Sequence, residues 1–597
     1  MPNLKKHGLL DESRGGERRT DSNDQRDSNE VNQLRKLGLR YACDFDVLVI
    51  AKGLKKRQGT KVKSIDISST GLLVEFNPTA NLFNVGDTVE LRFEIPPGTM
   101  PEGMESSVKI EAIVDRECQH QHDGQEMWVV AFTFVKPLTD YLQKKRWGYT
   151  TLIASTLLLM AILFIILMRV ESVIYFKYNK VLYLYSLLAA SFLLTRYLFG
   201  AFYRNVKINP DYTPGVSIII PCFNEEEWIQ RTIISCMNQD YPIDKLEVIV
   251  VDDQSTDRTV EQIYKAVEGL NKEAEHYLTK DRLHVHVLKE NGGKRVALVQ
   301  GVEMAQHDLV VFVDSDSFLE PNAIINLVQP FQDPKMGGVA GRTDVENKYT
   351  NFITKLQTVR YYIAFRVMKA AESYFDCVTC LSGPLSCYRK ELIVKHTDAW
   401  LNQKFLGQPA TFGDDRSMTN YILKTHRTGY QDKAVCSTIV PSRIGVFLKQ
   451  QMRWKRSWLR ESLRAGTFIW RKELFMAFFF YIGLIVPIAA PIIVLYNMLY
   501  VPIVYGVIPT TFMMGLLLMA LLMSLSYLFF RKSKLWVFGF VFCAFYELVL
   551  LWQMPIAWVT FWKSTWGTRD TPQDVEARNK KLVKKQKKNS IALNSRQ

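Results

Sequence analysis

The chain has 597 residues, which is enough for several domains, because single hydrophobic cores rarely extend beyond about 250–300 residues. Hydrophobic residues make up 48% of it, and the formal net charge is +15. A nucleic-acid binder could carry such a charge, but the sequence has neither zinc-finger spacing nor a basic helix repeat, so we expect no nucleic-acid partner. Basic residues that border apolar spans, together with an anionic substrate, explain the charge more simply.

The nine cysteines are scattered along the chain. Cys377 and Cys380 form a C-x-x-C pair, but no second pair or histidine completes a zinc site, so we expect reduced thiols in a protein core. The first forty residues are charged and polar, and they do not read as a cleavable signal peptide.

The N-terminal part divides into an arm and a small domain. Residues 1–30 are rich in charged and small polar residues, which predicts a disordered arm. Short apolar or alternating runs follow, with Gly, Pro and Asn turns between them, at 46–51, 72–76, 89–93, 108–114 and 128–134. This pattern predicts a small β-barrel over residues 31–140.

Apolar spans flank the middle of the chain. Residues 149–168 carry no charge, and 181–202 carries only Arg196 near its end, which we expect to reach toward the interface. Both belong to a segment of two transmembrane helices over 145–204. On the other side, 474–530 is uncharged before Arg531 and contains four prolines, and 535–562 is apolar apart from Glu547. We predict three crossings in the first of these and one in the second, so that 474–562 is helical and the chain has about six crossings. Two crossings and a re-entrant element are the alternative.

A region over 210–465 has the pattern of an α/β domain. Buried strands are predicted from Val216 onward, at 246–251 and at 308–313, and helical patterns at 227–237, 259–270 and 294–304 separate them. A mostly parallel sheet follows from this order. Ligands bind at the carboxyl ends of such strands, where the polar and acidic turns fall.

Those turns carry residues suited to breaking a sugar–diphosphate bond. Asp314 and Asp316 can hold Mg²⁺ or Mn²⁺, because hard cations prefer carboxylate oxygens. Lys294 and Arg295 open a helix after two glycines, where cations and backbone N–H groups can face phosphates. Asp415, next to Asp414, can act as general base for an acceptor hydroxyl.

Each motif also has an ordinary structural interpretation. An Asp-x-Asp after a strand is often a helix cap or a solvated loop, a Gly-Asp-Asp-Arg can simply begin a helix, and residues 447–458 can form an amphipathic helix at the membrane surface. The order of the whole set, between membrane spans, favours the chemical interpretation.

The ordered set resembles the processive membrane glycosyltransferases of family 2, in the hyaluronan synthase branch, with chitin and nodulation oligosaccharide synthases close by. The resemblance covers roughly residues 214–569. The matching stretches are Asp252-Asp253-Gln254-Ser255, Gly293-Lys294-Arg295, Asp314-Ser315-Asp316-Ser317, residues 382–389, Gly413-Asp414-Asp415-Arg416, residues 450–461 and Trp566-Gly567-Thr568-Arg569. It implies a GT-A glycosyltransferase domain and inversion of the anomeric centre by direct displacement.

The resemblance also implies a role for each residue. Asp253 would contact the nucleoside with Asp252 beside it, Lys294 and Arg295 the diphosphate, and Asp314 and Asp316 the nucleotide and metal. Asp415 would be the base. Gln450, Arg453 and Trp454 would line the acceptor end, and Trp566 and Arg569, in a gating segment and basic tail over 563–597, would close over the donor.

Three positions depart from the family pattern. Gln254 stands where Gly is frequent, and Ser317 where Thr is common. The Gly-Asp-Asp form differs from the Thr-Glu-Asp of cellulose synthases and is shared with mannuronan synthases, which keeps a GDP-linked donor open.

Within the predicted barrel, Asp66, Ser68 and Gly71 sit at the start of a strand, with Arg35 and Arg40 upstream. This set resembles the PilZ domain, a bacterial receptor for cyclic di-GMP, whose phosphates and guanine faces suit guanidinium groups. Lys36 stands where a second Arg is usual, and lysine cannot reproduce a bidentate, stacked contact. A barrel used only for docking is the alternative.

Taken together, these features predict a multi-pass enzyme of a bacterial plasma membrane, with its catalytic and PilZ-like domains in the cytoplasm. It would polymerise a sugar from a nucleotide donor, most simply a UDP-sugar, export the growing polysaccharide and respond to cyclic di-GMP. A transferase that adds one sugar to a lipid carrier and a non-catalytic receptor are the alternatives, and the need for an export subunit stays open.

Overall fold

The computed structural model describes residues 155–166, 180–272, 279–410, 412–506, 508–563, and 41–138 with interruptions at 43–44, 52–58, 69, 77–83, 97–106, 123–124 and 137. The predicted arm over 1–30 therefore lies outside the described residues. So do Arg35, Arg40, Trp566 and Arg569.

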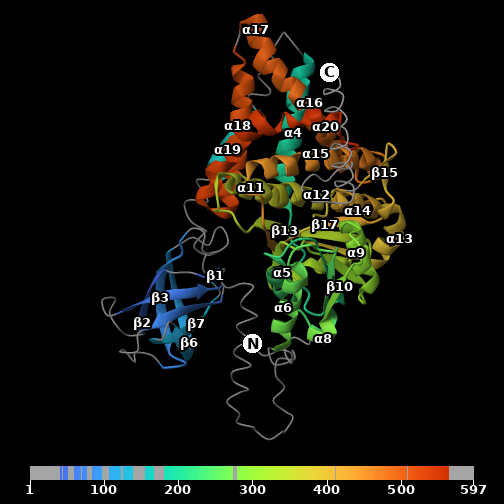
Figure 1. Cartoon of the computed structure of the whole chain (residues 1–597). Coiled ribbons are helices and arrows are strands. Elements are labelled where there is room, and N and C mark those ends of the chain that lie inside the picture. Colours follow the sequence, from blue (N-terminus) through green and yellow to red (C-terminus); the bar gives the residue numbers. More distant parts are fainter. Residues whose placement is uncertain are drawn as a thin grey trace, which may run out of the picture.

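The N-terminal domain is a closed barrel (Figure 1). Its strands are β1 (Tyr41–Ala42), β2 (Asp46–Ala51), β3 (Thr60–Ile67), β4 (Gly71–Phe76), β5 (Thr88–Glu94), β6 (Ser107–His122) and β7 (Gln125–Phe134). Six of them run in the order β3-β2-β5-β6-β7-β4, and the pairing of β3 with β4 closes the ring while β1 pairs with β3. Inward side chains such as Val47, Leu91 and Phe132 are buried. The predicted barrel is confirmed.

The middle of the chain forms one eight-stranded sheet in the order β10-β9-β8-β11-β14-β13-β17-β12. The strands are β8 (Val216–Cys222), β9 (Leu246–Asp252), β10 (Leu283–Val287), β11 (Leu309–Phe312), β12 (Ser317–Leu319), β13 (Met336–Val345), β14 (Ser386–Arg389) and β17 (Arg427–Thr438). The first four are parallel, β14 runs against its neighbours, and β13 is parallel to β17. The predicted parallel arrangement is confirmed for the first four strands. The other four strands pair in both parallel and antiparallel directions.

Helices cover both faces of this sheet. On one face, α5 (Ile229–Met237) and α6 (Thr259–Lys272) bury Ile233 and Ile263 against the strands. On the other, α9 (Lys294–Met304), α13 (Lys390–Leu401) and α14 (Asp414–Leu423) pack around Leu298, Trp400 and Met418. The central strands are buried on both faces, which explains their continuous apolar sequence.

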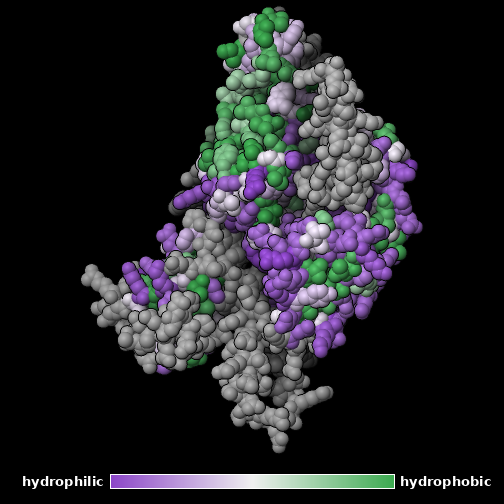
Figure 2. Space-filling model, viewed as in Figure 1, coloured by the Kyte–Doolittle hydropathy of each residue, from purple (hydrophilic) through white to green (hydrophobic). Residues whose placement is uncertain are grey.

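Among the described residues, three helices are long and apolar enough to cross a membrane: Leu184–Phe202 at the end of α4 (Lys180–Phe202), Leu474–Tyr505, and Phe512–Arg531 within α18 (Thr510–Arg531). A shorter apolar helix spans Ser155–Ile166. Figure 2 shows the apolar surface over these helices and the polar surface over the α/β domain. The chain is thus a membrane protein.

The predicted count of about six crossings is wrong for the described residues. Where three short crossings were expected, α16 (Leu474–Leu495), η6 (Tyr496–Tyr500) and α17 (Val501–Tyr505) form one helical run and α18 the second. Pro487 and Pro491 lie inside α16 without ending it, because a transmembrane helix tolerates the lost backbone bond where other groups satisfy the carbonyl. The last apolar stretch is divided into α19 (Val537–Phe545), η8 (Tyr546–Leu550) and α20 (Gln553–Trp558).

Two helices lie between the membrane helices and the sheet (Figure 1). These are α11 (Phe352–Ile363), which continues into the π-helix η4 (Ala364–Lys369) and α12 (Ala370–Ser373), and the amphipathic α15 (Ile444–Gly466). Arg196 on α4 does not reach toward water as expected. It is buried, with its guanidinium 3.8 Å from Glu372 and over the ring of Phe192, so a carboxylate of the interface layer compensates its charge.

Candidate active site

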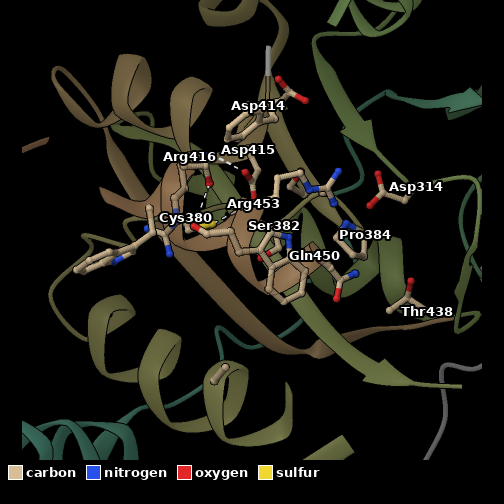
Figure 3. Close-up of a pocket in the computed structure, with 18 of the residues that line it drawn as sticks. Asp314, Cys380, Ser382, Pro384, Asp414, Asp415, Arg416, Thr438, Gln450 and Arg453 are labelled. Atoms are coloured by element: carbon tan, nitrogen blue, oxygen red, sulfur yellow. Dashed lines mark hydrogen bonds between the residues drawn. The ribbon is translucent and has the colours of Figure 1, made fainter. Parts of the chain in front are cut away.

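A cavity of about 750 Å³ opens where the carboxyl end of β11 meets α9, α14 and α15. It brings together eight of the residues that the sequence singles out. These are Lys294, Asp314, Asp316, Asp414, Asp415, Gln450, Arg453 and Trp454. Figure 3 shows Asp314 and Thr438 on one side of the cavity and Asp415, Arg416 and Cys380 on the other, with Gln450 and Arg453 between them.

Asp314 and Asp316 follow β11 in a tight turn. Asp314 forms an ion pair with Lys294, the first residue of α9. Asp316 accepts a hydrogen bond from the Thr438 hydroxyl at 3.3 Å, at the end of β17. Two carboxylates and a lysine ammonium therefore line the same edge of the cavity, as the sequence predicts.

These two carboxylates suit a divalent cation that also binds a diphosphate. Mg²⁺ and Mn²⁺ accept one or two protein carboxylates, with phosphate oxygens and water as the other ligands. The described residues contain no cluster of three acidic, histidine or cysteine ligands, so a cation here would take part of its ligand shell from the substrate. The donor set of Asp314 and Asp316 fits that role.

Asp253 has a different environment from the one expected. Its side chain is buried, and its two oxygens accept hydrogen bonds from the backbone N–H groups of Gly292 and Gly293 at 2.8 and 2.9 Å. The expectation that these N–H groups are open to phosphates is therefore wrong, because the carboxylate already satisfies them. Asp252 is also buried and accepts hydrogen bonds from the backbone and hydroxyl of Ser255. Neither aspartate lines the cavity, and their predicted role at the nucleoside stays a prediction.

Arg295 points away from the cavity that Lys294 enters. Its Nε donates to Oδ1 of Asp414 at 2.5 Å, and its Nη1 donates to the Trp400 carbonyl at 2.7 Å and to Gln403 at 3.1 Å. Both partners of the ion pair are buried. The sequence predicts that Arg295 contacts the diphosphate, but one residue along a helix turns the side chain by about 100°, so Arg295 faces Asp414 and not the side that Lys294 enters. It instead anchors the helix that carries Asp415.

Asp415 lies in the first turn of α14, with its side chain at the cavity. Its Oδ2 accepts a hydrogen bond from the Cys380 thiol at 3.2 Å, and its Oδ1 accepts one from the backbone of Arg416 at 2.8 Å. The preceding Gly413 has a left-handed backbone with φ of 81°, and a Cβ there would approach Cβ of Ser457 to 2.7 Å. Only glycine accommodates both conditions without strain, which explains the residue before the two aspartates.

The helix α15 supplies the opposite wall of the cavity. Gln450, Arg453 and Trp454 all line it, and the Trp454 ring lies 6.2 Å from that of Tyr361 on α11. A buried Arg460–Glu461 pair fixes the helix, because Glu461 also accepts hydrogen bonds from Gln403 and from Asn420 of α14. The expected acceptor-end residues thus face Asp415 from a firmly held element.

Four further cavity residues are absent from the sequence-based prediction: Arg360, Lys369, Cys380 and Lys455. Lys369 is buried at the end of the π-helix and donates to the Ser382 hydroxyl. Burial lowers its pKa, while Cys380 and Asp415 oppose that shift. A lysine or arginine within a largely apolar helical pattern was the available signal for Arg360 and Lys369, whereas Lys455 stands in a basic run that gives no such signal.

In the barrel, the described part of the second predicted site has a structural function. Asp66 lies near the end of β3, Ser68 lies in the turn that follows, and Gly71 is the first residue of β4. The three residues therefore span the connection between two strands, and only Gly71 stands at the start of one. The buried Ser68 hydroxyl accepts a hydrogen bond from the Gly71 N–H at 3.0 Å. A Cβ on Gly71 would lie 2.6 Å from the Phe132 carbonyl, so strand packing itself requires glycine here.

Comparison with known proteins assigns the family. The description Glycosyl transferase family 2 matches residues 217–396, and Chitin synthase matches residues 401–595. A hyaluronan synthase of Streptococcus pyogenes is 34% identical over 311 residues, which are 52% of this chain and 72% of that protein. The chain belongs to glycosyltransferase family 2. Within it the enzyme is hyaluronan synthase-like and chitin synthase-like, and the predicted glycosyltransferase class is confirmed.

Two further matches extend the comparison. An N-acetylglucosaminyltransferase of Mesorhizobium japonicum is 37% identical over 257 residues, 42% of this chain and 58% of that one. Among solved structures, a mannosyltransferase from Pyrobaculum calidifontis in complex with GDP-Man and Mn²⁺ is 21% identical, covering 62% of this chain and 99% of that chain with a TM-score of 0.40. The two matched family segments begin after the N-terminal barrel, so they do not confirm the PilZ resemblance of that domain.

Proposed function

We propose that this glycosyltransferase is a processive synthase, which adds sugar units from a UDP-sugar to a growing glycan and passes the product through the membrane. The observation that carries this proposal is the extent of the cavity. It runs from Asp314 and Asp415 to Gly483 and Pro487 of α16, in the membrane region. A site that only modified a small soluble acceptor would not need to reach a membrane helix.

The residues of the cavity divide the chemistry between its two sides. The acceptor hydroxyl oxygen attacks the anomeric carbon while the bond from that carbon to the diphosphate oxygen breaks. Asp415 takes the hydroxyl proton, and the nucleoside diphosphate leaves with the bonding electron pair. Direct displacement of this kind inverts the anomeric centre.

Charge that develops on the leaving diphosphate would be stabilised by the other side of the cavity. Lys294 and Arg453 line it and supply positive charge. A Mg²⁺ or Mn²⁺ ion held by Asp314 and Asp316 would supply further Lewis-acid stabilisation. Trp454 offers an aromatic face on which a sugar ring of the acceptor can stack, and Gln450 lies beside it.

We further propose that the donor is a UDP-sugar, because the named relatives are a hyaluronan synthase and an N-acetylglucosaminyltransferase. A GDP-sugar in a mannuronan-like reaction and a single addition to a lipid carrier are the competing proposals. The latter is disfavoured by the depth of the cavity. Since nucleotide sugars are made in the cytoplasm, the α/β domain would lie on the cytoplasmic side of a bacterial plasma membrane, with Asp253, Trp566 and Arg569 acting at the donor.

Regulation by cyclic di-GMP is a separate proposal for the barrel. Its support is the closed six-stranded architecture and the Asp66, Ser68 and Gly71 turn, with Arg35 and Arg40 supplying phosphate contacts. Calorimetry of the full chain with cyclic di-GMP, with Arg40→Ala as control, tests it. Absence of binding by the wild type rejects it.

The synthase proposal is tested by incubating purified full-length protein in nanodiscs with UDP- and GDP-sugars, singly and in pairs, with Mg²⁺ or Mn²⁺. We expect release of UDP together with a product of high molecular mass that grows with time. A product with a single added sugar under every donor combination would contradict processivity, and GDP release alone would reassign the donor.

A further inference from the structure

The end of β17 holds one of the two carboxylates that fit a divalent cation. Thr438, the last residue of β17, donates from its hydroxyl to Oδ1 of Asp316 at 3.3 Å, and the Ile439 N–H donates to the Asp316 carbonyl at 3.3 Å. Ser317, the next residue after Asp316, lies opposite Thr438 in the pairing of β12 with β17. Figure 3 shows Thr438 at the same side of the cavity as Asp314. The place of the Asp316 carboxylate therefore depends on where β17 ends.

The neighbouring strand β13 fixes that end of β17. The two strands run parallel, with Asp344 opposite Ser437 and Val345 opposite Thr438. Directly after β13, the Glu346 N–H donates to the Thr438 carbonyl at 2.9 Å. A displacement of β13 would therefore move Thr438, and with it the hydroxyl that holds the carboxylate of the cation site.

A membrane helix is attached to β13 at this point. Arg531, the last residue of α18, forms an ion pair with Asp344, and its guanidinium lies 4.5 Å from the centre of the Tyr362 ring of α11. Arg342, two residues earlier on the same face of β13, places Nη2 3.4 Å from Oδ2 of Asp344. Burial alone would raise the pKa of Asp344, but the two guanidinium groups more than offset this and hold the pKa at about 2. The carboxylate is therefore charged, and the attachment is present, at neutral pH.

The same ion pairs extend to the layer between the membrane helices and the sheet. A register shift after Gly341 makes residues 432–434 of β17 a bulge. Asp432 in this bulge has Oδ2 3.4 Å from Nη1 of Arg342 and 3.8 Å from Nε of Arg366 in the π-helix η4. Three arginines and two aspartates thus connect the end of α18, the interface layer and both strands.

These contacts make β13 move together with the end of α18. The Asp344 side chain is 20% exposed, so separation from Arg531 would remove charge compensation from a largely buried group. A close-packed sheet transmits such a displacement, because a protein interior has low compressibility. Metal sites respond to it, since loss of a group that holds a ligand in place lowers metal affinity by about 10–100-fold.

We propose that Arg531, Asp344 and Thr438 form a positioning chain from the membrane helix α18 to the cation site. Through this chain, the end of α18 sets the place of the Asp316 carboxylate and thereby the affinity of the site for Mn²⁺ or Mg²⁺. By linkage, a bound cation stabilises one position of α18 to the same extent. This inference rests on the proposed metal-dependent transfer, since it requires a cation at Asp314 and Asp316.

The test measures Mn²⁺ binding directly instead of activity. Electron paramagnetic resonance of the free ion gives the Kd of Mn²⁺ for the full-length protein in nanodiscs with saturating UDP, and UDP without protein is the blank. Thr438→Val removes the hydroxyl and keeps the shape of the side chain, so we expect the Kd to rise about tenfold. Thr438→Ser keeps the hydroxyl and should stay within about twofold of the wild type.

A second variant breaks the chain at the membrane helix. Arg531→Gln leaves Asp344 paired with Arg342, so the buried carboxylate keeps a counter-charge and the fold is retained. We expect the Kd of Mn²⁺ to rise about fivefold. The matched control is Arg427→Gln at the opposite end of β17, whose pair with Asp333 is half-exposed, and its Kd should stay within about twofold of the wild type.

The double variant separates a positioning chain from two independent effects. Thr438→Val/Arg531→Gln should bind Mn²⁺ within about twofold of Thr438→Val alone, because the effect of Arg531 passes through the hydroxyl that is already missing. If Arg531 only joined the membrane helices to the domain, the two effects on the Kd would multiply. That result would overturn the chain.

Two further outcomes would also overturn it: an unchanged Kd in Thr438→Val or in Arg531→Gln, or an equal rise in Arg427→Gln. Absence of Mn²⁺ binding by the wild type would remove the cation site itself. Polymer synthesis and UDP release from the donor panel are followed in parallel. Their absence with every donor rejects the synthase function, whereas polymer synthesis with an unchanged Kd in the variants rejects only the positioning chain.

Discussion

Arg295 and Asp414 form an ion pair of 2.5 Å that connects the start of α9 to the start of α14. Each lies next to a cavity residue, Lys294 in one helix and Asp415 in the other. The ion pair is buried directly next to these two cavity residues. It therefore sets the distance between the diphosphate side, at Lys294, and the acceptor side, at Asp415. The two positions are 119 residues apart in the sequence.

Removal of one partner of this pair should destabilise the domain strongly. We expect Arg295→Gln to lower the free energy of unfolding by about 3–5 kcal/mol, because it leaves the Asp414 carboxylate buried without a counter-charge. Thermal unfolding in detergent checks this. Arg258→Gln is the control, since its pair with Glu226 is largely exposed and should contribute less than about 1 kcal/mol. Equal shifts for the two variants would refute the structural role of Arg295.

Loss of the Asp415 carboxylate should stop elongation without preventing donor binding. Asp415→Asn keeps the size of the side chain but cannot take the acceptor proton, so we expect kcat for sugar transfer to fall by about 10²–10⁴-fold. UDP-sugar affinity, measured by calorimetry, should change little. Asp398→Asn, an exposed aspartate on α13, is the control. Polymer synthesis at the wild-type rate by Asp415→Asn would remove Asp415 from the role of base.

A divalent cation should be required at the other side of the cavity. We expect EDTA to abolish UDP release and added Mn²⁺ or Mg²⁺ to restore it, because Asp314 and Asp316 are the oxygen ligands available there. Asp316→Asn removes one ligand charge, so the concentration of Mn²⁺ for half-maximal activity should rise about tenfold or more. Activity unaffected by EDTA after exhaustive dialysis would show that the two carboxylates act without a metal.

The Cys380 thiol should be unreactive at neutral pH although it lines the cavity. Burial and the neighbouring Asp415 carboxylate raise its pKa to about 11, so only about one thiol in a thousand is a thiolate at pH 8. Mass spectrometry should find slow alkylation by iodoacetamide that accelerates as the pH rises. Asp415→Asn should react faster at the same pH, because one cause of the raised pKa is gone. Rapid alkylation of the wild type at pH 7 would contradict this environment.

Much of the fold follows from local sequence pattern. The strands of the parallel half are continuous apolar runs that end in polar turns, and α9 spans the residues that its pattern predicts. The strand β3 was missed because its buried side holds the polar Ser64 between Val62 and Ile67, which breaks the run of apolar residues. The membrane topology was miscounted because a proline inside an apolar helix has the same sequence signal as a proline between two helices.

The sequence predicts which residues belong to the site, but it does not predict where each side chain points. Asp314, Asp316, Asp415 and Trp454 meet in one cavity as expected, since each lies at the end of an element that converges there. Arg295 follows Lys294 directly, yet it points about 100° away around the helix and serves Asp414 instead. The Cys380–Asp415 contact joins segments 35 residues apart, and no local pattern could indicate it.

Lys455 should lose its charge at a lower pH than an exposed lysine on the same helix. Burial, assisted by the nearby charge of Arg360, lowers its folded-state pKa from 10.5 to about 8, and its ammonium lies 5.1 Å from the centre of the Tyr546 ring. An amine reacts with formaldehyde in reductive methylation only in its neutral form, so we expect the rate for Lys455, read by mass spectrometry, to level off above about pH 8. The rate for the exposed Lys449 should keep rising to about pH 10. Identical pH profiles for the two lysines would contradict this environment.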